Sequence, residues 1–390
     1  MEQRQQRKLD HIRHALALAD GPQTNGFEDV RLVPQALSGV DMNAIDLGCA
    51  FLGKRLRLPL LINAITGGTA QVTGINAALG RVARQAGVAL AVGSQAAAIR
   101  DASLWPTYRV ARQANPDGVL IANVNPNVAV ADALRAIEAI EADGLQVHVN
   151  VAQELNMTEG DRDFHRWLDN IAAIVKASPV PVIVKEVGCG ISAEVTARLL
   201  DAGVRYIDTG GAGGTNFVAI EQQRRQVPAV QTAQDAQTPS LLPADQAALM
   251  AWGLPTAVSL AEVLYAVRRF RREARSSTAV GQQEHLPAPG DDVHVIASGG
   301  VRGGFEVAKA LVMGASLVAV AGEVLRYLLT PQGDWHESGE QAALDYLDRL
   351  QRGCATAMTM VGSGDIASLQ RCPYVLTGAT QAWLSQRGMN

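Results

Sequence analysis

The chain has 390 residues, of which 48% are hydrophobic and 4% aromatic, and its 34 Lys and Arg nearly balance its 38 Asp and Glu. The formal net charge of -4 excludes a global attraction to nucleic acid or to an anionic membrane, so local groups would have to hold any anionic ligand. No apolar run reaches the roughly 18 residues that span a bilayer, and no apolar signal core follows the charged N-terminal stretch. Its cysteines form no CxxC pair. We therefore expect a cytoplasmic protein with reduced thiols and with no nucleic-acid or membrane partner.

Short apolar runs recur along the chain, each closed by small or polar residues and followed by an Ala-rich helical stretch. This alternation is typical of βα units. The runs begin at Leu58, Ala89, Val119, Leu145, Pro181, Tyr206, His294 and Leu317. Eight such units favour an α/β fold of the TIM (β/α)8 barrel type over an open doubly wound sheet, for which about six strands are usual.

The barrel is predicted to form a single domain over 1–390 with an N-terminal extension before the first run. The interval between the sixth and seventh runs is far longer than an ordinary βα connection. We interpret 218–250, whose centre is polar and rich in Gln, as a mobile active-site loop and 272–292 as a surface insert. A covering helix is expected from Trp252 onward, and the C-terminal region 338–384 is predicted to be helical.

The loops after the seventh and eighth strands are candidates for a phosphate site, because active sites of such barrels lie at the C-terminal ends of the strands. The seventh run ends in Ser298-Gly299-Gly300-Val301-Arg302-Gly303-Gly304 and the eighth in Ala321-Gly322. Glycines there let backbone N–H groups approach a phosphate. Since tight turns also need glycine, one such loop is weak evidence, but two at these positions favour a phosphate ligand.

The fifth and sixth runs end in less decisive patterns. The stretch Asp208–Thr215 is dense in glycine and could form either a floor for a flat ring or a hinge for the long loop that follows. Lys185 and Glu186 close the fifth run. A buried Lys is costly unless it is paired, so it must meet either a ligand or the adjacent carboxylate in a structural ion pair.

The fourth run is the most informative, because polar side chains leave a strand that is too apolar to need them. His148 and Asn150 share one face of this strand, and Gln153 and Glu154 follow directly. A lone His is more often a satisfied core residue than a catalyst. A His, two amides and a carboxylate that converge at the mouth of a barrel are better explained by a polar ligand or a metal ion.

Taken in order, these motifs resemble those of the type 2 isopentenyl-diphosphate isomerases, which are FMN-dependent barrel enzymes, and the resemblance covers nearly the whole chain. By themselves, the basic residues Arg7, Lys8 and His11 at helical spacing are typical of a solvated helix face. The segment from His148 to Glu154 is the most specific piece. The matching motifs are Arg7-Lys8-Leu9-Asp10-His11, Thr66-Gly67-Gly68, Gly93-Ser94-Gln95, His148 to Glu154, Lys185 to Gly190, Gly213-Gly214-Thr215, Trp252 to Thr256 and Ala297 to Arg302.

The resemblance implies an isomerase of isoprenoid biosynthesis that interconverts isopentenyl and dimethylallyl diphosphate. It implies reduced FMN acting as an acid-base group, Mg²⁺, NADPH as the reductant, and a homotetramer or homo-octamer. Gln153 and His148 would be catalytic, and Glu154 would hold Mg²⁺. The diphosphate substrate would contact Arg7, Lys8, His11, His148 and Asn150, with Gln153 beside the reacting carbons. FMN would contact Ala64, Ile65, Thr66, Ser94, Asn123, Lys185, Thr215, Gly300, Arg302, Gly303, Ala321 and Gly322.

Three positions depart from the family pattern and bear on substrate affinity more than on flavin binding. Ile65 stands where Met is usual, Ala96 follows the Gly-Ser-Gln motif where Arg is usual, and Asn125 replaces the glycine of an Asn-x-Gly. The missing Arg removes one anionic contact. The 272–292 insert is also atypical.

Other functions are weighed against this one. An FMN-dependent oxidoreductase of the 2-hydroxy acid oxidase class is the main alternative, but such enzymes use a His-Arg pair near strands six and seven, and 208–217 contains no His. A nucleotide dehydrogenase of this fold needs a Cys after strand six, where none is present. A barrel that only senses a phosphorylated ligand leaves Gln153, Glu154 and Lys185 without a role.

Overall fold

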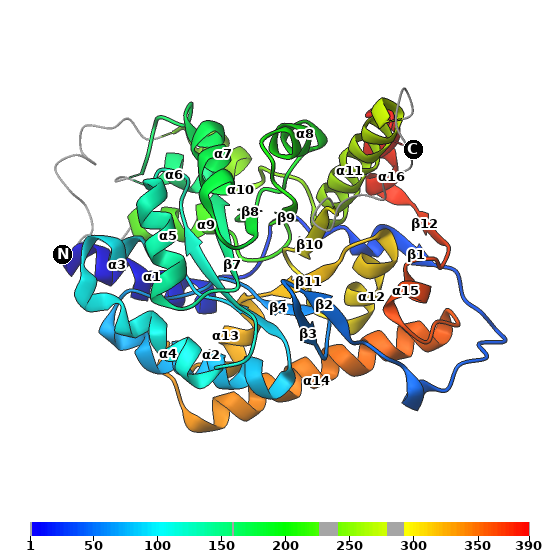
Figure 1. Ribbon diagram of the computed structural model, residues 1–390, viewed down its shortest axis with the longest axis horizontal. Coiled ribbons are helices and arrows are strands. Elements are labelled where there is room, and N and C mark those ends of the chain that lie inside the picture. Colours follow the sequence, from blue (N-terminus) through cyan, green and yellow to red (C-terminus); the bar gives the residue numbers. More distant parts are fainter. Residues whose placement is uncertain (1, 158–159, 226–240, 279–291, 390) are drawn as a thin grey trace.

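Eight parallel strands close into a barrel in the computed structural model, which describes residues 2–157, 160–225, 241–278 and 292–389 (Figure 1). The side chains of residues 2–9, 225 and 276–278 lie outside the described part. The order around the barrel is β10-β11-β4-β5-β6-β7-β8-β9, with β9 pairing back to β10. Every strand of the barrel coincides with a predicted apolar run, so the TIM barrel prediction is confirmed. The strands are β4 (Leu60–Ile62), β5 (Ala89–Ala91), β6 (Leu120–Val124), β7 (Gly144–Val149), β8 (Val182–Glu186), β9 (Tyr206–Asp208), β10 (His294–Ser298) and β11 (Leu317–Val320).

Helices surround the barrel, and short helices sit where several strands end. The outer helices are α2 (Thr73–Ala86), α4 (Pro106–Ala114), α5 (Val130–Ala139), α7 (Trp167–Ala177), α8 (Ala193–Asp201), α11 (Thr256–Thr278), α12 (Gly304–Met313) and α14 (Glu337–Met360). The short ones near the strand ends are α3 (Ala96–Arg100), α6 (Val151–Asn156), α9 (Phe217–Arg225), α10 (Pro243–Met250) and α13 (Gly322–Leu328). The remaining helical segments are α1 (Glu2–Ala17), α15 (Ile366–Leu369), α16 (Gly378–Gln386), and the 3-10 turns η1 (Phe27–Asp29), η2 (Met42–Ala44), η3 (Ala70–Val72) and η4 (Ala102–Leu104).

Two small antiparallel pairs lie outside the barrel. The hairpin of β2 (Cys49–Phe51) and β3 (Lys54–Leu56) precedes β4, and β1 (Val30–Leu32) pairs with β12 (Tyr374–Leu376). The β1–β12 pair brings a segment that follows α1 beside a segment near the C-terminus (Figure 1). The prediction of an all-helical C-terminal region was therefore wrong at β12, because a three-residue edge strand is too short to show the alternation that identifies strands.

The long interval after β9 is more helical than predicted. The segment 218–250 begins within α9 and ends with α10, while its centre, 226–240, lies outside the described residues. Likewise, 272–278 belongs to the end of α11, and 279–291 lies outside the described residues. The prediction of a loop over the whole of 218–250 thus fails at both ends, where Pro243 starts one of the helices.

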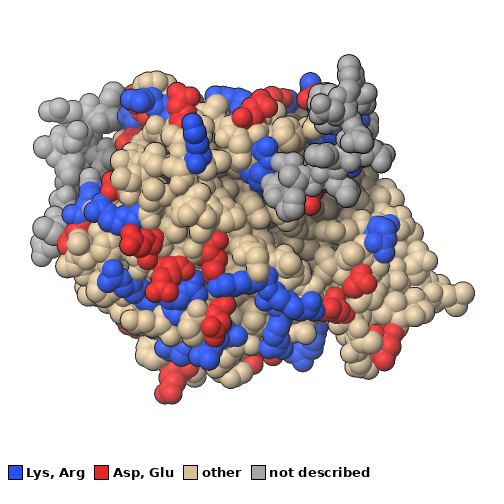
Figure 2. Space-filling view, viewed as in Figure 1, with Lys and Arg blue, Asp and Glu red and all other residues tan. Residues whose placement is uncertain are grey.

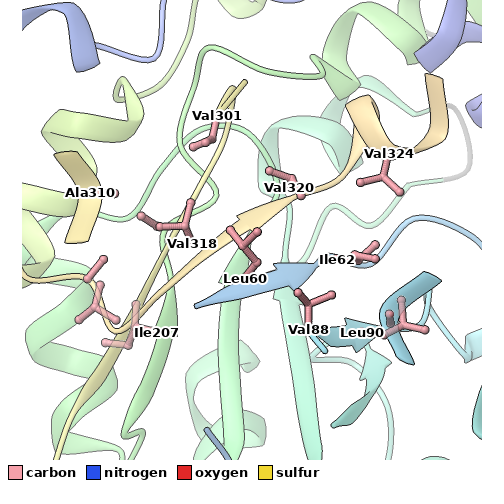
Figure 3. Close-up of a cluster of buried hydrophobic side chains, with 14 of the residues drawn as sticks. Leu60, Ile62, Val88, Leu90, Ile207, Val301, Ala310, Val318, Val320 and Val324 are labelled. Carbon is pink, nitrogen blue, oxygen red and sulfur yellow. The ribbon is translucent and has the colours of Figure 1, made fainter. Parts of the chain in front are cut away.

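Alternation along the strands divides the apolar side chains into two sets. Leu60 and Ile62 of β4 point outward, and with Val318 and Val320 of β11 they pack between the barrel and its covering helices (Figure 3). The second set fills the barrel interior and is joined at the N-terminal end by Phe51 and Leu56 of the hairpin. Its barrel members are Leu61, Ala89, Ala91, Val119, Ile121, Ile183, Ile296, Leu317 and Ala319.

The surface fits the nearly balanced composition. On the face shown in Figure 2, Lys and Arg are interspersed with Asp and Glu, so this face presents no field of one sign. Among the described residues, none of the helices has the length and apolar character that crossing a membrane requires.

Truncating the barrel interior should cost far more stability than truncating the surface. Leu61 is fully buried in the interior set, so Leu61→Ala should lower the free energy of unfolding in urea by about 3 kcal/mol. Leu37 is 95% exposed, and Leu37→Ala should change it by less than about 0.5 kcal/mol. Equal losses in the two variants would contradict the assignment of the core.

Candidate active site

The barrel interior changes from apolar to polar at its C-terminal end. Two residues beyond Leu61 on the same face comes Asn63, and two beyond Ile121 comes Asn123. The same step leads from Ile183 to Lys185. Because all the strands are parallel, these side chains and those of Gln146, His148, Asp208 and Ser298 gather at the C-terminal end of the barrel interior, where they form its polar level.

Above this polar level lies a cavity of about 350 Å³, large enough for a small-molecule ligand. The residues predicted from the sequence that line it are His11, Ala64, Ile65, Thr66, Ser94, Asn123, His148, Asn150, Gln153, Glu154, Lys185, Thr215, Gly300, Arg302, Ala321 and Gly322. Gly303 is not among the lining residues. The side chains of Arg7 and Lys8 lie outside the described residues, although both residues belong to α1, which packs against α9 and α13.

The glycines around this cavity allow backbone segments to approach one another closely. A Cβ at Gly300, whose φ is +68°, would lie 2.2 Å from the carbonyl oxygen of Gly213, and a Cβ at Gly214 would lie 2.6 Å from the amide nitrogen of Gly300. The Asp208–Thr215 stretch therefore packs directly on the loop after β10. A Cβ at Gly322 would lie 2.8 Å from Thr215 Oγ1, which brings the loop after β11 into the same cradle.

Two buried polar atoms in the cavity wall point to a polar ligand. Within the described part of the chain, Thr66 Oγ1 and Asn150 Oδ1 have no hydrogen-bond partner. Leaving such atoms unsatisfied is costly, so a ligand that meets them gains the bond that the protein does not make. The two residues lie on different strand ends, after β4 and after β7, so the ligand region spans the cavity.

Lys185 and Glu186 do not form the side-chain ion pair that was one alternative. Lys185 is 9% exposed, lines the cavity and donates to the backbone carbonyl of Glu186. The Glu186 carboxylate instead accepts from the backbone N–H groups of residues 187–190, at 2.5 to 3.1 Å. Burial raises the pKa of Glu186 to about 7, and these N–H groups act in the opposite direction. A basic Nζ is thus left facing the cavity.

The residues after β7 form a hydrogen-bonded group on α6. Asn150 Nδ2 donates to Gln153 Oε1 and to Glu154 Oε1, both at 3.0 Å, and the backbone N–H of Asp161 donates to Glu154 Oε2 at 2.8 Å. Asn150 therefore positions both of its neighbours and turns its own oxygen away from them. Oxygen donors of this kind are what Mg²⁺ prefers.

Glu221 on α9 is a functional candidate that the sequence analysis missed. It is 1% exposed, and its Oε1 lies 2.6 Å from His11 Nε2 and accepts from Gln153 Nε2 at 3.2 Å. It also pairs with Arg224. The carboxylate thus joins the N-terminal helix to the Gln153 group. The signal that could have found it is Glu221 and Arg224 at i and i+3 on one helix face, in a segment that we interpreted as a loop.

Arg100 and Asp161 also line the cavity without having been predicted. Arg100 ends α3, one helical turn after Ala96, the position where the family pattern has Arg. The cavity therefore has an arginine on this helix at a different position. Arg302, which was predicted, forms ion pairs with Asp20 and Glu323, so its charge is already partly neutralised.

Comparison with known proteins decides the family. Residues 124–375 match the family model of FMN-dependent dehydrogenases. An isopentenyl-diphosphate delta-isomerase of Moorella thermoacetica is 42% identical over 98% of this chain and 97% of its own length, and one of Symbiobacterium thermophilum is 41% identical over 100% and 97%. The chain belongs to the family of FMN-dependent, type 2 isopentenyl-diphosphate delta-isomerases. The resemblance inferred from the ordered motifs is confirmed.

Solved structures support the fold of this isomerase family member. A mandelate oxidase with (S)-2-phenylpropionate is 17% identical, with a TM-score of 0.58 over 94% of both chains. A lactate oxidase of Pediococcus acidilactici is 16% identical, with a TM-score of 0.59 over 95% of this chain and 87% of its own. At such low identity these matches show a shared barrel and carry no argument about the reaction.

Replacing Glu221 with Gln should weaken the acid dependence of folding stability. Burial opposes ionisation of this carboxyl group, but the hydrogen bond and charge of His11 and the charge of Arg224 hold its pKa at about 2, below its ordinary value of 4.5. A lowered folded-state pKa contributes stability that is present above about pH 4.5 and is lost as the pH falls towards about 2. Between these values the wild type should lose more free energy of unfolding than Glu221→Gln.

The matched control is Glu273→Gln, which removes an exposed carboxylate paired with Arg269. This variant should follow the wild-type acid dependence, because an exposed ion pair contributes little. If Glu221→Gln also followed it, the buried His11–Glu221 contact would not be an ionic one.

Proposed function

We propose that this protein interconverts isopentenyl diphosphate and dimethylallyl diphosphate at the cavity above the polar layer, using reduced FMN and Mg²⁺. The observation that carries the proposal is the group of Asn150, Gln153 and Glu154 beside His148 in a cavity with two unsatisfied polar atoms. The relatives that share at least 40% identity over nearly their whole length are named for this reaction.

FMN fits the part of the cavity formed by the ends of β4, β8, β10 and β11. The close backbone contacts of Gly214, Gly300 and Gly322 form a cradle in which larger residues would collide with their neighbours. Thr66 Oγ1 offers a polar group that lacks a partner among the described residues, and Lys185 Nζ offers a cation. When bound in its reduced form, FMN supplies the acid-base chemistry that moves a proton between the substrate carbons.

The diphosphate group is best accommodated between α1, β7 and α6. His11 and His148 line this side of the cavity, and α1 carries Arg7 and Lys8. Glu154 would hold Mg²⁺ together with phosphate oxygens and water, as suits a small hard cation. Asn150 donates to the Glu154 carboxylate through its Nδ2, while its Oδ1 has no hydrogen-bond partner among the described residues.

Gln153 would lie beside the reacting carbons of the substrate. Its Oε1 accepts from Asn150 and its Nε2 donates to Glu221, so both ends of the amide are held. A side chain that is fixed at both ends can orient a substrate without conformational loss on binding. Because Glu221 also contacts His11, the position of α1 and the placement of Gln153 are coupled through one carboxylate.

Oxidation of a 2-hydroxy acid is the second candidate, since the family model and the solved structures share its fold. That chemistry uses a His-Arg pair near strands six and seven. The described residues that line the cavity after β9 and β10 include Arg302 but no His. Arg302 is moreover paired with Asp20 and Glu323. These features favour isomerisation.

The reaction should need reduced flavin without consuming it. With isopentenyl diphosphate, FMN and Mg²⁺, activity should appear when NADPH or dithionite is added in an amount equal to the flavin, and one reduction should support many turnovers. Product formation is followed together with the redox state of the flavin under anaerobic conditions. Equal activity of the oxidised enzyme, or one reductant consumed per product, would contradict this proposal and favour the oxidoreductase alternative.

Removing the carboxylate of Glu154 should remove the response to Mg²⁺. In Glu154→Gln, kcat should fall by roughly a hundredfold or more, because the ion no longer has a charged ligand to hold it against the substrate phosphates. Asp163→Asn changes an exposed carboxylate in the following loop and should keep the wild-type Mg²⁺ titration. An unchanged Mg²⁺ requirement in Glu154→Gln would contradict the assignment.

A further inference from the structure

We propose that a buried chain of amides holds His148 in the tautomer that carries its proton on Nδ1, which makes Gln146, Asn63 and Asp208 positioning residues of the active site. The consequence for substrate binding rests on the proposed function. The tautomer itself does not, because it follows from hydrogen bonds within the protein.

The chain of hydrogen bonds crosses the barrel interior at its polar level. Asn63 Nδ2 donates to Asp208 Oδ2 at 2.7 Å, and Gln146 Nε2 donates to Asn63 Oδ1 at 2.8 Å. Asn123 Nδ2 then donates to Gln146 Oε1 at 3.0 Å, and His148 Nδ1 lies 2.8 Å from Asn123 Oδ1. The members come from β9, the end of β4, β7 and β6, so barrel closure is what brings them together.

The direction of this chain is fixed at its Asn63 end. The backbone N–H of Ala64 donates to Asn63 Oδ1 at 3.0 Å, so that atom must be the oxygen and the amide nitrogen must face Asp208. The contacts of Asp208 are consistent with this direction, because its carboxylate accepts from Asn63 Nδ2, Ser298 Oγ and the backbone N–H of Gly210. Each amide then sets the orientation of the next.

The last amide sets the state of the imidazole. Asn123 turns its nitrogen to Gln146 and its oxygen to His148, and an amide oxygen can only accept. His148 Nδ1 must therefore carry a proton. The backbone N–H of Asn123 donates to Gln95 Oε1 at 2.9 Å, which further holds this residue in place.

Burial makes the orientation strict. Gln146 and Asp208 are fully buried, and Asn123 and Asn63 are 2% and 3% exposed. Without water to replace a lost bond, reversing one amide would set oxygen against oxygen and nitrogen against nitrogen along the chain.

With Nδ1 committed to the chain, the neutral ring has only an acceptor at Nε2. A phosphate oxygen also accepts only, so His148 can donate to it solely as the imidazolium. Lys185 stands at the position of β8 that pairs with His148, and Asp208 ends the amide chain. The other charged or titratable groups described around the same cavity are His11, Arg100, Glu154, Asp161, Arg302 and Glu323. The amide chain thus allows His148 to donate a hydrogen bond to a phosphate oxygen only as the imidazolium, whereas the neutral ring can only accept at Nε2.

The tautomer can be measured by ¹⁵N NMR on protein labelled at histidine, with His148→Gln used to identify the signal. In the substrate-free wild type at a pH where the ring is neutral, Nδ1 should be protonated and Nε2 should not. Gln146→Met keeps the volume but breaks the chain, so Asn123 can turn over and both tautomers should appear. A wild-type ring protonated on Nε2, or an unchanged tautomer in Gln146→Met, would overturn the proposal.

Kinetics separate positioning from general loss of structure. Gln146→Met should raise the KM for isopentenyl diphosphate by roughly tenfold with a smaller change in kcat, because an oriented contact to the substrate is weakened. Thr196→Val is the control, because it removes a fully buried hydroxyl on α8 that donates to the backbone carbonyl of Ser192 and takes no part in the chain of amides. Both variants can lose stability, but only Gln146→Met should change the tautomer and KM. If Gln146→Met does not fold, the wild-type spectrum alone decides.

Discussion

Barrel closure with strict alternation along every strand is the constraint on which the rest of the structure depends. It forces alternate residues into the interior, so that Leu61, Ile121 and Ile183 are each followed two residues later, on the same face, by Asn63, Asn123 and Lys185. Burying these polar side chains is costly unless they form hydrogen bonds with one another. They do so through the bonds from Asp208 to His148, and the cavity is built on that polar level.

Much of the fold could be predicted because each strand is a short apolar run between turn residues. The features that were missed had no such pattern. The strand β12 has three residues and pairs with β1, which is distant in sequence. The helix α9 is followed by a polar, Gln-rich stretch, and the composition of that stretch favours a loop for the whole segment. Tertiary contacts, which no local pattern records, determine both elements.

The candidate site was predicted in part for a related reason. His148, Asn150, Gln153 and Glu154 form a dense polar group in sequence, so they could be recognised. Gln146 lies within an apolar run, and its role appears only when Asn63 and Asn123 are brought beside it from other strands. Likewise, Glu221 can be recognised as a site residue only from its contact with His11, which lies 210 positions earlier in the chain. Fold likeness to hydroxy acid oxidases does not separate the two reactions, whereas the nearly full-length relatives are named for the isomerisation.

The central claim, that this cavity holds FMN, is tested most directly by flavin uptake. Purified protein titrated with FMN and followed by its visible spectrum should bind one flavin per chain. Gly322→Val should weaken this binding by at least about tenfold, because a Cβ at Gly322 already lies 2.8 Å from Thr215 Oγ1. Gly364→Ala, where a Cβ meets nothing within 4 Å, should bind like the wild type. No uptake by the wild type, or equal affinity in Gly322→Val, would contradict the account.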